Sequence, residues 1–273
     1  MIAIAPGCWK GLRRAEECRI TREAAQDINY HDSQIVQLYN IANPPGPDTD
    51  FYVSLAGSTP STVLDLGCGT GTLCCALAAS GHQVTGVDPA AAMLAIARSK
   101  PNARFVEWVE SSAQTYASSR PFDLIVMTGH AFQVLLTDED TLAVLTTMRY
   151  HLGERGKIVF ESRNPTLDWA EQWAGRVRKL PGGILETLEI IANNGEFISF
   201  ETIYQFADKE LRTRSTLRFP SAEHVQELIS RSGLKVRQIL GDWDSNPLEI
   251  TRSPEMIFFV EHPGRNQTDS TTR

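Results

Sequence analysis

The chain has 273 residues, 42 % of them hydrophobic, which is enough to bury a core in one enlarged domain or in a domain with a cap. Its 33 acidic residues outnumber the 26 basic ones and give a formal net charge of -7, which argues against a nucleic-acid partner because such proteins usually display a basic surface. The opening MIAIAPGCWKGLRRAEECRI is too charged for a signal peptide, and no run of about eighteen apolar residues occurs, so we expect no membrane association and a cytoplasmic location.

Cysteine and histidine usage gives no sign of a disulfide framework or a metal site. The five cysteines are an odd number without the spacing of zinc ligands, and the six histidines are scattered along the chain. We therefore expect reduced thiols, no metal and a small molecule as the partner. The cysteines are Cys8, Cys18, Cys68, Cys74 and Cys75.

Apolar, β-rich segments alternate with helical patterns through the middle of the chain, which predicts a parallel sheet covered by helices. Thr137 and Asp140 form a capping box at the start of one helix, and Gly153 marks its end. The predicted strands are 62–67, 83–88, 103–109, 122–128 and 156–161, and the predicted helices are 71–80, 90–99 and 138–152.

The pattern changes to alternating strands between residues 165 and 220, where Asn193, Asn194 and Gly195 predict a hairpin turn. A helix after Pro220 and strands near 234–240 and 255–261 then return to the first pattern. The predicted organisation is a main domain of residues 23–164 and 221–262 with an N-terminal helical lid, an antiparallel insertion or cap of residues 165–220, and flexible tails of residues 1–22 and 263–273.

The segment VLDLGCGTG is a glycine-rich turn between a predicted strand and a predicted helix, a place where the backbone can approach a ligand closely. The third glycine of a dinucleotide-binding motif would fall on Thr72, so the spacing does not fit that motif. Asp65 precedes the turn, and residues 60–97 contain no Lys or Arg, which suits a pyrophosphate poorly. S-adenosylmethionine fits better, because its ammonium group can lie beside the loop and its ribose hydroxyls can donate to Asp88.

These stretches, VLDLGCGTG followed by VTGVDPAAAMLAIA, resemble the class I S-adenosylmethionine-dependent methyltransferases. The resemblance implies a doubly wound α/β fold with a mostly parallel seven-stranded sheet and one reversed strand. It also implies that the cofactor lies across the carboxyl ends of the first strands. By position, the resemblance assigns the methionine part of the cofactor to Asp65, Gly67, Gly69 and Gly71, the ribose to Asp88, and the adenine to Pro89 and Met93.

Two further family positions depart from the usual pattern. Ser112, ahead of Ala113, stands near the adenine where an acidic residue is common, and its hydroxyl can still accept or donate a hydrogen bond. The segment IVQLYNIANPPGPDTDFYVSLAG resembles the helical lid of such enzymes and places Tyr39 near the methionine end, although Asn40 replaces a common aspartate. We expect these residues to belong to the cofactor site.

The acceptor side is expected after the fourth and fifth strands, where the topology places the substrate. His130 is either a base or positioning group for the acceptor, or a histidine that caps loop carbonyls. Arg163 and Asn164 are candidates for substrate contact, with a salt bridge to the lid as the structural alternative.

The sequence therefore predicts an enzyme that transfers a methyl group from S-adenosylmethionine to nitrogen or oxygen of a small molecule by in-line displacement. One alternative is a nicotinamide-dependent oxidoreductase, which the glycine spacing disfavours. Another is a cofactor-binding module without transfer activity, for which Ser112 and Asn40 are the only support. The insertion could also serve as the interface of a homodimer.

Overall fold

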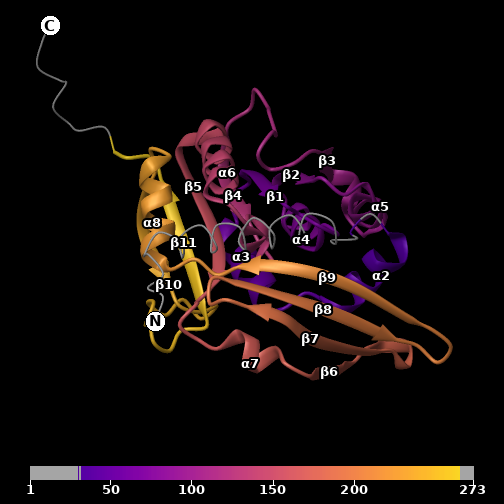
Figure 1. The fold of residues 1–273 in the computed structure, drawn as a ribbon. Coiled ribbons are helices and arrows are strands. Elements are labelled where there is room, and N and C mark those ends of the chain that lie inside the picture. Colours follow the sequence, from indigo (N-terminus) through magenta and orange to yellow (C-terminus); the bar gives the residue numbers. More distant parts are fainter. Residues whose placement is uncertain (1–29, 31, 265–273) are drawn as a thin grey trace, which may run out of the picture. The chain divides into compact units, whose positions relative to one another are not determined.

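The computed structural model describes Tyr30 and residues 32–264 (Figure 1). Both predicted tails lie outside the described residues, except for Pro263 and Gly264. The described chain divides into two compact units, one made of residues 30–169 and 218–264 and the other of residues 170–217.

The larger unit is built on a seven-stranded sheet with the order β10-β11-β5-β4-β1-β2-β3. β11 pairs antiparallel with β5 and β10, and the other pairs are parallel. This arrangement confirms the predicted doubly wound α/β sheet with one reversed strand. The strands are β1 (Thr62–Leu66), β2 (Gln83–Asp88), β3 (Val106–Glu110), β4 (Phe122–Met127), β5 (Leu152–Arg163), β10 (Lys235–Leu240) and β11 (Glu255–Glu261).

Helices cover both faces of this sheet. Side chains of α6 and α8 pack in one core cluster with β4, β5 and β11, and side chains of α3 and α4 pack in a second with β1, β2 and β4. Side-chain caps begin α6 and α8, since the Thr137 side chain accepts from the Asp140 amide and the Ser221 side chain accepts from the His224 amide. The helices are α2 (Ser33–Ala42), α3 (Pro47–Ala56), α4 (Thr72–Ala79), α5 (Ala91–Ser99), α6 (Asp138–His151) and α8 (Ala222–Arg231).

Two predicted boundaries are wrong by several residues. Residues Ala103–Phe105 form a 3-10 turn after Asn102, whose φ of 66° is left-handed, so β3 begins only at Val106. The fifth strand, β5, begins at Leu152 instead of residue 156, because Gly153 lies inside the strand and does not separate it from the preceding helix. A Cβ on Gly153 would lie 2.9 Å from the Phe122 carbonyl oxygen, so the glycine allows β5 to start close beside β4.

The smaller unit is a four-stranded sheet with the order β6-β7-β8-β9, in which β6, β7 and β8 pair antiparallel. The predicted hairpin turn is confirmed, since Gly195 has a φ of 91° and Asn194 Oδ1 accepts the amide of Phe197 at 2.8 Å. The strands are β6 (Arg176–Lys179), β7 (Leu185–Asn193), β8 (Phe197–Gln205) and β9 (Glu210–Arg218), and the short helix α7 (Trp169–Trp173) precedes them.

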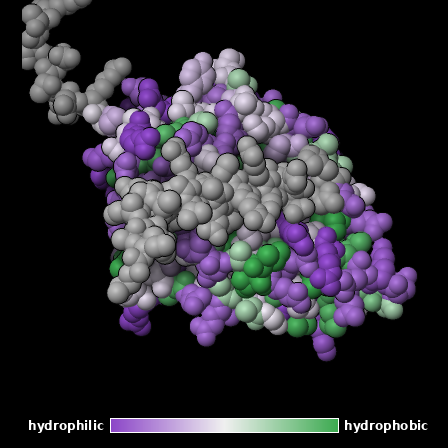
Figure 2. Space-filling view, in the orientation of Figure 1, coloured by the Kyte–Doolittle hydropathy of each residue, from purple (hydrophilic) through white to green (hydrophobic). Residues whose placement is uncertain are grey.

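The described surface shows mainly hydrophilic residues on the face drawn in Figure 2, with hydrophobic residues interspersed among them. Exposed large hydrophobic side chains include Phe105, Tyr150 and Val177. Across residues 32–264, none of the helices has the length and apolar content needed to cross a bilayer.

Candidate cofactor and acceptor site

The glycine loop joins the carboxyl end of β1 to α4. Gly67, Gly69 and Gly71 have φ values of 75°, 54° and 70°, a left-handed conformation that side-chain-bearing residues rarely adopt. A Cβ on Gly71 would lie 2.3 Å from the Trp108 ring, whereas a Cβ on Gly69 would meet no described atom within 4 Å. The loop therefore packs tightly on one side and presents an open backbone face at Gly69.

Asp88, at the end of β2, ties this loop to the sheet. Its Oδ2 accepts the amide of Gly69 at 2.8 Å, and its Oδ1 accepts the amide of Ala90 at 2.9 Å. A carboxylate oxygen can accept more than one hydrogen bond, so these two bonds do not exclude the ribose role that the resemblance gives Asp88. Sequence reasoning predicted the second role and missed the first.

Asp65 carries a buried carboxylate oxygen whose hydrogen-bonding capacity is unused within the described residues. Its Oδ2 accepts from the Cys74 thiol at 3.2 Å, and its Oδ1 has no hydrogen-bond partner there. Burial raises the pKa of Asp65 to about 7. An unsatisfied buried acceptor is costly, and a cationic group beside it would remove that cost. The ammonium group of S-adenosylmethionine is such a cation, so Asp65 and the open face at Gly69 fit this cofactor.

Two of the predicted adenine and lid residues, Met93 and Tyr39, belong to one packed cluster. Met93 is buried, and Tyr39 packs against the cluster to which Met93 belongs. The Tyr39 hydroxyl would lie 4.0 Å from a Cβ built on Gly129, so α2 reaches the loop that follows β4. Ser112 Oγ lies 2.8 Å from Thr115 Oγ1, whereas Ala113 is buried and Pro89 is exposed.

A lysine contacts the glycine loop, although the loop's own segment lacks basic residues. Lys100 Nζ donates to Thr70 Oγ1 at 3.1 Å and to Thr72 Oγ1 at 2.6 Å. Burial lowers the pKa of Lys100. The loop therefore has a basic neighbour that residues 60–97 do not contain, because α5 returns the chain to the loop and Lys100 follows its last residue.

His130 lies directly after β4 and is held in place by two carboxylates. Its amide donates to Glu161 Oε1 at 2.8 Å, and its Nε2 lies 2.9 Å from Glu255 Oε2. Its φ of 60° is left-handed and uncommon for a residue with a side chain, and such conformations gather at functional sites. The recorded partner of the imidazole is a carboxylate and not a loop carbonyl, which favours the functional interpretation of His130 over the capping one.

Glu161 and Glu255 complete this side of the site. Glu161, near the end of β5, is buried and also accepts a hydrogen bond from the Tyr52 hydroxyl of α3. Burial raises the pKa of Glu161 and raises that of Glu255 to about 7. Sequence reasoning did not single out these two glutamates. The available signal was a charged residue beside an apolar run, in IVFESR and in PEMIFFV.

Arg163 and Asn164 have different surroundings. Arg163 Nη1 donates to Gln133 Oε1 at 2.9 Å, and its guanidinium lies 5.7 Å from the Trp169 ring centre. Asn164 is fully buried, and its Nδ2 donates to the carbonyl oxygens of Ile250 and Ser253 at 2.7 and 2.8 Å. The Asn164 side chain thus holds the loop before β11, and its contact with substrate stays a prediction.

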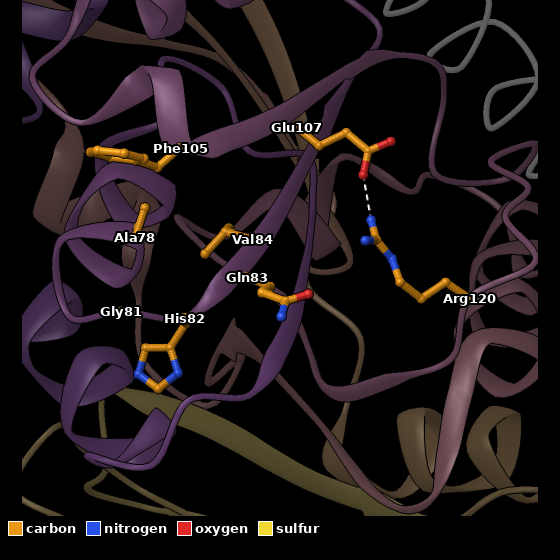
Figure 3. Close-up of a pocket in the computed structure, with 8 residues that line it drawn as sticks. All are labelled: Ala78, Gly81, His82, Gln83, Val84, Phe105, Glu107 and Arg120. Carbon is orange, nitrogen blue, oxygen red and sulfur yellow. Dashed lines mark hydrogen bonds and ion pairs between the residues drawn. The ribbon is translucent and has the colours of Figure 1, made fainter.

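A surface hollow lies at the other edge of the sheet, where β2 begins and β3 follows its 3-10 turn (Figure 3). An ion pair between Arg120 and Glu107 borders it, and both side chains are about half exposed. The hollow lacks the buried acidic side chains that lie together at the carboxyl edge of the sheet. Its lining residues are Ala78, Gly81, His82, Gln83, Val84, Phe105, Glu107 and Arg120. Among the described residues, no cluster of three or more His, Cys, Asp or Glu side chains could hold a metal ion.

Comparison with known proteins agrees with this geometry. The family described as "Methyltransferase domain" matches residues 63–156. The cypemycin N-terminal methyltransferase of a Streptomyces species is 29 % identical over 242 residues, covering 86 % of this chain and 98 % of that protein. A putative methyltransferase of Geobacillus sp. strain WCH70 is 33 % identical over 218 residues, covering 72 % and 83 %. The solved structure of the CcbJ methyltransferase from Streptomyces caelestis has a TM-score of 0.73 at 19 % identity, covering 86 % and 98 %.

The chain therefore belongs to the class I S-adenosylmethionine-dependent methyltransferases. It is an enzyme whose methyl donor is S-adenosylmethionine, and the oxidoreductase alternative is set aside. The match to residues 63–156 covers the glycine loop, Asp88 and His130, and it ends before Glu161 and Glu255.

Proposed function

We propose that the chain methylates the amino group of a small molecule. The observation that carries this proposal is the concentration of carboxylates around His130 at the carboxyl edge of the sheet. Glu161 bonds the His130 amide, Glu255 bonds its imidazole, and Asp48 from the first turn of α3 acts electrostatically on His130 and Glu255. A negative site attracts a protonated amine more strongly than a neutral hydroxyl compound.

A relative supports nitrogen over oxygen as the acceptor atom. The cypemycin N-terminal methyltransferase is named for methylation of the N-terminus of cypemycin, and it matches this chain over 98 % of its own length. The sequence alone left nitrogen and oxygen open, and the carboxylates at the acceptor side now favour nitrogen.

The residue roles within this function are part of the proposal. His130 is the group that takes a proton from the acceptor or orients it, and Arg163 contacts the acceptor at the same rim. The proposed cofactor contacts are Tyr39, Asp65, Gly67, Gly69, Gly71, Asp88, Pro89, Met93, Ser112 and Ala113.

The chemistry divides between cofactor and protein. When bound, S-adenosylmethionine supplies a methyl group already activated on a sulfonium. The chain's residues hold the acceptor in line, take the proton from its nitrogen and exclude water, and the positioning and desolvation together can contribute several kcal/mol. Tyr39 on α2 and Tyr52 on α3 supply the N-terminal side of this enclosure.

The proposal is tested by incubating the purified chain with methyl-labelled S-adenosylmethionine and matched acceptor pairs. The pairs are glucosamine with glucose, benzylamine with benzyl alcohol, and triglycine with its N-acetylated form. We expect label in at least one amine and not in its partner. Label confined to the hydroxyl compounds would refute an amine acceptor.

Three expectations from the sequence stay predictions. We propose that the protein works in the cytoplasm, binds no nucleic acid and could form a homodimer. Cell fractionation, a gel-shift assay at physiological salt and light scattering coupled to gel filtration test them in turn.

A further inference from the structure

We propose that Glu255 is a positioning and charge-stabilising residue for His130, so that the two side chains act as one proton-accepting pair for the methyl acceptor. The inference rests on the methyl-transfer activity of the site, and it applies to an amine acceptor as proposed above. Glu255 lies almost one hundred residues beyond the part of the chain that matches the family described as "Methyltransferase domain", which ends at residue 156.

The reversed strand is what brings Glu255 to the site. β11 runs antiparallel to β5, so its first residue, Glu255, pairs with Arg163, the last residue of β5. The amide of Glu255 donates to the Gly241 carbonyl at 3.1 Å, which fixes the backbone there. A parallel strand would place its first residue at the opposite edge of the sheet. The antiparallel direction of β11 therefore places the Glu255 carboxylate at the edge of the sheet where His130 follows β4.

The charged and titratable groups around the pair come from two elements, β5 and α3. Arg163 on β5 acts on both members, as does Asp48 on α3. Glu161 on β5 acts on His130, and Tyr52 on α3 is influenced by Glu255. Burial lowers the pKa of His130 to about 3 and raises the pKa of Glu255 to about 7. Below neutral pH the pair is thus a neutral imidazole beside a carboxylic acid, and above it Glu255 becomes the carboxylate.

The carboxylate form can take up one proton. In that form the Nε2–H of His130 donates to Glu255 Oε2, and the Nδ1 lone pair is left to accept a proton. A protonated amine gives its proton to Nδ1, and the proton already on Nε2 then moves toward Glu255 Oε2, so that the carboxylate takes up the added positive charge. The freed nitrogen lone pair forms the bond to the methyl carbon while the carbon–sulfur bond breaks, with its electron pair left on sulfur. The proton leaves to water after product release.

A purely structural role explains the pair poorly. Burying a histidine and a glutamate costs desolvation free energy that apolar side chains of similar volume would avoid. His130 also keeps a left-handed backbone, fixed by the Glu161 carboxylate. Two buried carboxylates thus hold one histidine through different atoms, Glu161 through the backbone amide and Glu255 through the ring.

The first test needs no acceptor. Histidine side chains are labelled with ¹⁵N, and their resonances are followed by NMR from pH 5 to 9 with S-adenosylhomocysteine bound. His130→Asn assigns the His130 resonance, and asparagine also tolerates the left-handed backbone. We expect the wild-type His130 resonance to shift with a midpoint near neutral pH, and Glu255→Gln to abolish that shift. Glu261→Gln, at the far end of β11, should leave it intact. A midpoint that persists in Glu255→Gln would overturn the pairing.

The second test measures kcat/KM against pH with the amine that the acceptor panel shows to be methylated fastest. Wild-type kcat/KM should rise through pH 7 and level off, with a further limb from the amine's own pKa. Glu255→Gln should lose the limb near pH 7 and lower kcat/KM at pH 8 by roughly 10²-fold, the lower end of general base catalysis. An unchanged profile would overturn the role of Glu255. A panel that yields only hydroxyl acceptors would instead refute the amine, and the NMR titration would still decide on the pair.

Discussion

The hydroxyl of Tyr52 donates a hydrogen bond to the Glu161 carboxylate, which joins helix α3 to strand β5 across 109 positions of the sequence. Both side chains are 1 % exposed, and the other Glu161 oxygen accepts the His130 amide. One buried carboxylate therefore connects the N-terminal helices, the sheet and the loop that carries His130. The position of the acceptor side depends on that connection.

Tyr52→Phe should lower the free energy of unfolding by about 1–3 kcal/mol, because it leaves a buried carboxylate oxygen without its donor. Urea denaturation measures this change. Tyr150→Phe is the control, since Tyr150 is 77 % exposed and should show no measurable effect. Equal losses of unfolding free energy in the two variants would mean that the Tyr52 hydrogen bond does not stabilise the fold.

Gly69→Ala should abolish binding of S-adenosylhomocysteine. The added methyl group would enter the open face of the loop, where we place the methionine part of the cofactor. Gly81→Ala is a matched control, because Gly81 also has a positive φ and open space around its Cβ position, at the far end of α4. Both substitutions should cost about 1 kcal/mol of stability from backbone strain. Calorimetry that finds wild-type affinity in Gly69→Ala would remove the loop from the site.

Asp88→Ala should weaken S-adenosylhomocysteine binding by about 1.5–3 kcal/mol, the range for losing hydrogen bonds to a charged group. The substitution also leaves the amides of Gly69 and Ala90 without their acceptor, so a lower melting temperature should accompany it. Asp123→Ala serves as the comparison, since Asp123 caps Thr62 at the opposite edge of the sheet. Asp123→Ala should lower the melting temperature and leave the affinity for S-adenosylhomocysteine unchanged. An equal loss of affinity in Asp123→Ala would contradict a specific role for Asp88.

Asp65→Asn should raise the free energy of unfolding of the free enzyme, relative to wild type, more at pH 8 than at pH 4. The folded pKa of Asp65 is raised to about 7 from 3.8, so the unfolded chain releases its proton first, and wild-type stability falls as pH rises between those values. The neutral asparagine avoids this loss, which amounts to up to roughly 4 kcal/mol at about 1.36 kcal/mol per pH unit. Cofactor affinity should fall in the same variant. The unfolding midpoints of wild type and variant are measured at pH 4 and pH 8. An equal difference at both pH values would show that the charge on Asp65 does not cause the loss of stability.

Much of the cofactor side could be predicted from the sequence. The alternation of strands and helices places Asp65, Asp88 and His130 at the ends of the first, second and fourth parallel strands, and such ends meet at one edge of a sheet. The glycine spacing then indicates which cofactor the edge accepts. These features depend on short stretches of chain, which local patterns describe well.

The acceptor side could not be predicted in the same way. Glu161 and Glu255 come together only because β11 runs antiparallel beside β5, and neither residue has a local pattern that distinguishes it from an ordinary charge near a strand terminus. The loop-holding role of Asn164 was equally hidden, since no local pattern shows that this polar residue at the expected rim bonds the carbonyls of Ile250 and Ser253. Strand order and side-chain direction arise from packing over the whole chain.

The most direct test of the account is a crystal structure of the enzyme with S-adenosylhomocysteine. The account predicts that the homocysteine part lies over the open face at Gly69 with its ammonium group beside Asp65, the ribose meets Asp88, and the sulfur faces His130. A cofactor bound at the opposite edge of the sheet, or a sulfur directed away from His130, would contradict it.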